Sequence, residues 1–148
     1  MRHQAFARLT GFWSPLCLEL QMLPSPTIKQ LVEAIVQHEG VEAVLVIGRD
    51  GLLVDGRTGS ASVDLDSLAA HLPRVLNAAT ALGGAASGDG QGGRGDLVSA
   101  VMEFEQGLAL AAVLSPDATL LVLLGQGSNA APLLYDLRRF RGRIASII

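Results

Sequence analysis

The sequence is poor in the residues on which covalent, metal and nucleic-acid chemistry depend. Cys17 is the only cysteine, so no disulfide can form within the chain, and the three histidines have no metal-ligand spacing. Lys29 is the only lysine, and the net charge of −3 creates no broad attraction for nucleic acid. We therefore expect no metal site and no nucleic-acid partner. We also expect a cytoplasmic location, because nothing requires an oxidising compartment.

A long uninterrupted apolar segment is also absent from the sequence. The apolar run at 9–18 is too short to span a bilayer, and it lacks the small residues that precede a signal-peptide cleavage point. We therefore predict no membrane span, and we interpret residues 1–22 as a leader or a disordered N-terminal extension. Residues 23–148 are enough for a single domain with its own apolar core.

Regular apolar patterning begins near residue 25. Ser25 is a suitable helix cap, Pro26 suits the first helical position, and apolar residues then recur at helical spacing until Gly40. Two apolar runs follow at 41–47 and 52–54, and the Asp-Gly pair between them is typical of a tight hairpin turn. These features predict a helix followed by a β-hairpin.

The second half of the chain predicts a middle helix, three strands and a last helix. Asp64 is the expected cap of the middle helix, whereas Pro73 predicts a kink or two helical pieces. Strand-like runs lie at 97–105, 108–114 and 119–124, and the short connections between them allow only antiparallel neighbours. A last amphipathic helix completes the pattern, and its apolar stripe consists of Leu133, Leu137, Phe140 and Ile144.

The order of these elements, α-β-β-α-β-β-β-α, defines the expected fold class. It predicts an α/β (α+β) fold with a five-stranded antiparallel sheet between helices, the first and last helices on one face and the middle helix on the other. The run at 97–105 alternates polar and apolar residues, which indicates a half-exposed or edge strand. The last two strands are apolar on both faces and are therefore expected to be covered from both sides.

Two glycine motifs have the spacing of phosphate-binding turns. Gly88, Gly90 and Gly93 form G-x-G-x-x-G, but a helix precedes them and a strand follows, which reverses the order that aims a helix N-terminus at a phosphate. The related motif from Gly125 to Ala130 is followed by too few residues for a dinucleotide-binding β-α-β unit. We interpret the first as a flexible connector and the second as a turn, with Ser128 or Asn129 as the cap of the helix that follows. No cofactor is expected.

No set of side chains forms a catalytic constellation in the sequence. Glu103 and Glu105 share one face of a strand without a neighbouring histidine or metal ligand, and neither His38 nor His71 has a paired nucleophile. The arginines within 138–143 suit the end of a helix, with a binding role as the alternative. We therefore expect the protein not to be an enzyme.

From Pro26 to Ile148 the sequence resembles the Roadblock family of dynein-light-chain-type and MglB-type proteins. The most specific part is "IKQLVEAIVQHEGVEAVLVIGRDGLLVDG", a helix closed by glycine and followed by the hairpin, and a leucine- and alanine-rich helix comes next. The resemblance implies a profilin-like outline and a homodimer or heterodimer in which third strands pair edge to edge and middle helices pack together. It also implies a non-catalytic role as activator or scaffold of a small Ras-like GTPase.

Residues suited to such an interface lie on the middle helix and on the third strand. A dimer would cover surplus apolar positions of the helix and would pair the mixed-face edge strand. The candidate interface residues are Leu68, Leu72, Val75, Leu97, Ser99, Val101 and Glu103.

Two other functions stay open on the sequence alone. A small-molecule-sensing signalling domain has a similar outline, but it needs a polar-lined cavity, and the strands offer few polar groups to orient a ligand. A purely architectural adaptor would bind its partners without changing GTPase turnover.

Overall fold

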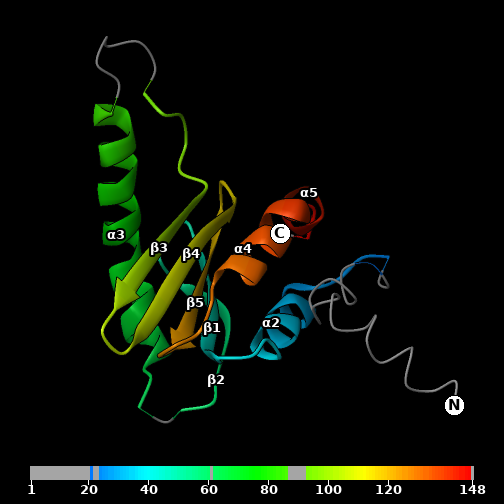
Figure 1. Cartoon of the computed structure of the whole chain (residues 1–148). Coiled ribbons are helices and arrows are strands. Elements are labelled where there is room, and N and C mark those ends of the chain that lie inside the picture. Colours follow the sequence, from blue (N-terminus) through cyan, green and yellow to red (C-terminus); the bar gives the residue numbers. More distant parts are fainter. Residues whose placement is uncertain (1–20, 22–23, 61, 87–92, 148) are drawn as a thin grey trace, which may run out of the picture.

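The computed structural model describes residues 21, 24–60, 62–86 and 93–147 (Figure 1). Cys17 and, apart from residue 21, the predicted leader therefore lie outside the described residues. The elements follow the predicted order: α2 (Ile28–Val36), β1 (Val41–Gly48), β2 (Leu53–Thr58), α3 (Leu65–Ala85), β3 (Ser99–Phe104), β4 (Gly107–Ser115), β5 (Ala118–Gly125), α4 (Ala131–Arg139) and α5 (Arg141–Ala145).

The five strands form one antiparallel sheet in the order β2-β1-β5-β4-β3. The predicted fold class is thus confirmed. β3 is an edge strand, as its mixed pattern predicts, and β4 and β5 are largely buried on both faces. β1 pairs with both β2 and β5, and it therefore joins the β1–β2 hairpin to the strands β3, β4 and β5.

Two apolar cores lie on opposite faces of this sheet. Figure 1 shows α3 on one side and α2, α4 and α5 on the other, as predicted from the element order. The larger core joins α2, α4 and α5 to the sheet, and the smaller core joins α3 to it. Successive strand residues serve different cores because their side chains alternate between faces. Leu110, for example, belongs to the larger core and Ala111 to the smaller one.

The first helix begins two residues later than the sequence pattern predicts. Thr27, not Ser25, is its cap: the Thr27 hydroxyl accepts a hydrogen bond from the Gln30 backbone N–H at 3.2 Å, and the Gln30 side-chain oxygen accepts one from the Thr27 backbone N–H at 2.8 Å. This reciprocal capping box satisfies two amides, whereas a single serine hydroxyl would satisfy one. The helix ends at Val36, with Gln37 as its C-cap, and therefore before Gly40, where the pattern predicts its end. Gly40, whose φ of +83° suits glycine, lies in the turn that leads into β1.

The middle helix runs through Pro73 as one element. Asp64 caps it as predicted, because its carboxylate accepts from the backbone N–H groups of Asp66 and Ser67 at 3.1 and 3.3 Å. The prediction of two helical pieces is wrong. Leu72, beside the proline, is buried against the sheet, and the Pro73 ring lies against Gly51 of the hairpin turn, so packing offsets the lost backbone hydrogen bond.

The predicted last helix is divided at Phe140 into α4 and α5. Phe140 has φ −99° and ψ 9°, outside the helical range, although its N–H still donates to the Asp136 carbonyl at 2.9 Å. The predicted apolar stripe is confirmed on both pieces, since Leu133, Leu137, Phe140 and Ile144 are all buried in the larger core.

His38 lies just beyond the end of α2, and its pKa is affected by Asp136 of α4. Burial lowers the pKa of His38, while the negative charge of Asp136 acts in the opposite direction and raises it. Its Nε2 is buried and has no hydrogen-bond partner among the described residues. The folded protein therefore favours the neutral imidazole.

We predict that the folded state loses stability as the pH falls through about 6.5, the ordinary pKa of histidine. The folded-state pKa of His38 is lowered, so the unfolded state binds the proton more tightly, and the stabilisation present above that pH is lost below it. Urea unfolding at pH 7.5 and 5.5 measures the loss. His38→Gln should show a smaller loss than the unsubstituted protein, and an equal loss would contradict this role.

Candidate protein–protein interface

Three of the residues considered as possible catalytic groups, Glu103, Glu105 and His71, lie on the surface, and the fourth, His38, is half-buried. Glu103 and Glu105 are exposed, and the His71 ring lies on the outside of α3, where its Nδ1 is 2.8 Å from the Ser67 carbonyl oxygen of the preceding turn. Within the described residues, no group of three histidine, cysteine, aspartate or glutamate side chains is placed to hold a metal ion.

Of the two glycine motifs, the structure describes the second in full and the first only at Gly93. Gly88 and Gly90 lie outside the described residues, and the chain beyond Gly93 leads into β3 rather than into a helix, as predicted. In the second motif Asn129 accepts a hydrogen bond from the Ala131 N–H at 3.0 Å. That contact supports the turn interpretation, because the side chain occupies an amide that a phosphate would need. The predicted helix cap is wrong, since the N-cap of α4 is Ala130 rather than Ser128 or Asn129, and no side chain caps it.

The backbone of β3 presents free hydrogen-bonding groups along the outer edge of the sheet. The Val113 N–H donates to the Val98 carbonyl at 3.0 Å, so even-numbered residues of this segment direct their backbone groups toward β4. The N–H and C=O groups of Ser99, Val101 and Glu103 therefore point away from the sheet. Such an edge is a template for pairing with another strand.

Exposed apolar side chains accompany these free backbone groups. Val101 is 48% exposed and Phe104 60%, on opposite faces of the strand. The other edge strand, β2, also exposes Val54, but its next residues are charged and paired: Arg57 lies 3.2 Å from Asp55 and 3.9 Å from Glu33. Paired charges protect an edge against further strand pairing, so β3 is the more open edge.

The middle helix contributes to both the core and the surface. Leu72 is only 3% exposed and packs into the smaller core beneath α3, so its side chain is already covered within one copy. Leu68 and Val75 are half-buried. Toward the end of the helix, Leu82 is 73% exposed, and Ala78 and Ala81 are also exposed. These apolar side chains form a surface that the sheet does not cover.

The predicted strand residues lie together along the β3 edge. Leu97 and Ser99 are half-buried, and Val101 and Glu103 are exposed. Ser99 pairs with Ala112 of the larger core, so Ser99, Val101 and Glu103 share the face covered by α4. The structure thus brings this part of the predicted set to one edge, on the opposite face from α3.

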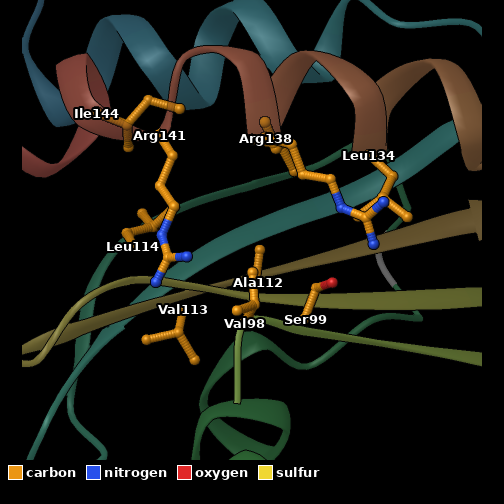
Figure 2. Close-up of a pocket in the computed structure, with 10 residues that line it drawn as sticks. Val98, Ser99, Ala112, Val113, Leu114, Leu134, Arg138, Arg141 and Ile144 are labelled. Atoms are coloured by element: carbon orange, nitrogen blue, oxygen red, sulfur yellow. The ribbon is translucent and has the colours of Figure 1, made fainter. Parts of the chain in front are cut away.

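A groove that sequence reasoning missed lies between this edge and the C-terminal helices (Figure 2). Its floor is mainly apolar, and the side chains of Arg138 and Arg141 descend into it from the helices. In the sequence, only the spacing of the two arginines, about one helical turn, indicates that both side chains lie on the same side of the helix. The groove is lined by Val98, Ser99, Ala112, Val113, Leu114, Leu134, Leu137, Arg138, Arg141 and Ile144.

The helices of the described segments differ from membrane-spanning helices. None of them combines the length and the apolar character that crossing a bilayer requires.

A five-stranded antiparallel sheet with helices on both faces is the class of fold to which the chain belongs. Residues 27–124 match the family model of the Roadblock/LC7 domain, and the chain belongs to that family. The resemblance stated from the sequence is therefore confirmed. No curated protein matches the chain in a sequence comparison.

Solved structures with the same fold include several Roadblock proteins. One is described as MglB with a tetrameric arrangement (18% identity, 78% of this chain and 83% of that chain covered, TM-score 0.65). Another is the gliding protein MglB from Thermus thermophilus (18% identity, 78% and 84% covered, TM-score 0.63). A third is a Roadblock/LC7 domain from Streptomyces avermitilis (24% identity, 82% and 97% covered, TM-score 0.59). At these identities the likeness establishes the fold.

Proposed function

We propose that this protein is a cytoplasmic, dimeric regulator or scaffold of a small Ras-like GTPase, and that it contributes no catalytic group of its own. The observation that carries the proposal is the open β3 edge in a chain of the Roadblock/LC7 family. Members of the MglB type that share its fold are expected to act on such GTPases, and one of them forms a tetrameric arrangement. The proposed domain is residues 23–148.

The dimer is proposed to form by antiparallel pairing of β3 with β3 of a second copy. Pairing would satisfy the outward backbone groups of Ser99, Val101 and Glu103 and would cover the exposed Val101 side chain. On the other face of the joined sheet, Leu68 and Val75 of the two copies of α3 would approach each other. In a two-fold symmetric interface of this kind, the same surface patch of each copy contacts its equivalent on the other copy.

The regulatory proposal predicts a change in GTP hydrolysis by the partner GTPase. We expect about a 100-fold faster single-turnover rate when the dimer holds the switch regions in a productive position, since misplacement of reacting groups costs about that much. The measurement compares the purified partner, identified by co-purification with this chain, with and without the protein. A regulator that provides no arginine finger should fall short of the roughly 10³-fold or larger effects that such fingers give.

The same assay separates the alternatives. Binding without any change in hydrolysis or nucleotide exchange would establish the architectural adaptor. Absence of both a complex and a rate change would refute regulation and scaffolding together.

A sensor domain is less well supported by the described core. Asp136 is the only charged residue buried among the described residues, and both cores are otherwise apolar. A ligand-sensing cavity needs several converging polar groups to orient its ligand. The apolar cores therefore favour a protein partner over a small molecule.

A further inference from the structure

The groove beside β3 carries two positive charges and no negative one. Figure 2 shows the Arg138 side chain reaching toward the end of the groove near Ser99 and Leu134, and Arg141 reaching toward Val113. No acidic residue lines the groove, and neither guanidinium pairs with a carboxylate in the part of the chain that the structure describes. The groove therefore suits an occupant that brings a carboxylate.

The same sheet edge carries negative charge without a positive partner. Glu103 is exposed on the α4 face of β3, directly opposite Leu108 of β4, and Glu105 follows in the turn. No described lysine or arginine pairs with either side chain. One strand thus has a carboxylate toward its end, and the groove at its beginning has the complementary charge.

Two-fold symmetry brings these opposite charges together. In a two-fold antiparallel pair the sheet faces of both copies coincide, so a residue of β3 lies opposite a residue of the same parity. An axis at Glu103 would oppose two carboxylates and is disfavoured. An axis at Val101 buries the two exposed valines against each other and places Glu103 opposite Ser99 of the second copy, at the groove.

We propose that, in the dimer of the proposed function on which this inference rests, Glu103 of each copy pairs with Arg138 of the other. The occupant of the groove mouth is therefore a second copy of this chain. Because the Val101 axis repeats the contact, each dimer holds the pair twice. The two pairs fix the strand register, since a shift of the axis by one residue would place Glu105 rather than Glu103 opposite Ser99.

The test is charge reversal in the full chain, with dimer dissociation followed by analytical ultracentrifugation. Arg138→Glu alone and Glu103→Arg alone should each weaken the dimer about tenfold, because each places like charges together twice. The double variant should return to within about threefold of the original dissociation constant. Arg139→Glu is the matched control, since the Arg139 guanidinium lies over the Phe140 ring, 5.5 Å from its centroid, and does not line the groove.

Each outcome has a distinct meaning. A monomeric parent protein at micromolar concentration would overturn the proposed dimer, and the charge pair with it. A dimeric parent whose affinity does not change in Arg138→Glu would overturn the charge pair alone. Rescue of Arg138→Glu by Glu105→Arg instead of Glu103→Arg would overturn the Val101 axis. Thermal unfolding of each variant confirms that these exposed substitutions leave the fold intact.

Discussion

Gly107→Ala is expected to destabilise the domain by about 3 kcal/mol. Gly107 begins β4 with φ +155°, and an added Cβ would collide with the backbone carbonyl oxygen of Leu124 on the neighbouring strand. Neither partner can move freely, because Gly107 pairs with Gly125 and the Leu124 side chain is buried in the larger core. Unfavourable φ contributes roughly 1–2 kcal/mol, and overpacking contributes roughly 1–3 kcal/mol.

Gly127→Ala is the matched control for this prediction. Gly127 also has a positive φ, +77°, but no atom lies within 4 Å of the position that a Cβ would occupy. It should therefore lose only the conformational contribution of about 1–2 kcal/mol. Urea unfolding at one fixed protein concentration measures both variants, since dimerisation makes stability concentration-dependent. Equal losses would show that contact with β5 is not the cause.

The order of elements and the edge position of β3 could be predicted because both depend on local patterns. Helical and strand periods differ, and the two-residue and four-residue connections after 105 and 114 leave no room for a parallel crossover. The alternation of polar and apolar residues around Val101 indicated a half-exposed strand, and the structure places that strand at the edge of the sheet. The distribution of helices over the two faces followed from the same order.

Predictions that failed concern competition between local and tertiary effects. Ser25 and Thr27 can both cap a helix, and only the reciprocal bond with Gln30 decides between them. Pro73 disfavours a continuous helix locally, but Leu72 and the Gly51 turn hold the helix on the sheet. Leu72 looks like an extra apolar residue when the helix is considered alone, but the packing of α3 on the sheet makes it a core residue.

The arginine groove could not be predicted because it joins segments that are distant in sequence. Arg138 and Arg141 follow the last strand, β5, whereas Val98 and Ser99 lie at the beginning of β3, two strands earlier. Sequence spacing places the two arginines on one side of a helix but does not say which strand lies beneath them. Only the packing of α4 and α5 on the β3–β4 hairpin makes them neighbours of the open edge.

Val101→Arg is expected to weaken the proposed dimer by at least about 100-fold, or roughly 2.7 kcal/mol. The valine is 48% exposed in one copy and would lie on the two-fold axis of the dimer, so the substitution would bring two guanidinium groups together at the centre of the interface. Juxtaposed like charges at an interface cost several kcal/mol. Light scattering on a sizing column should show a monomer at concentrations at which the parent protein is a dimer.

Val54→Arg provides a control on the opposite edge of the sheet. Val54 is 53% exposed on β2, the other edge strand, so the two substitutions change surface charge and exposed area alike and differ in the edge that they alter. A dimer that survives Val54→Arg and not Val101→Arg assigns the interface to β3, and the reverse result would assign it to β2. Partner regulation should be lost with the dimer in Val101→Arg and retained in Val54→Arg, because a switch-positioning surface built across two copies does not exist in a monomer.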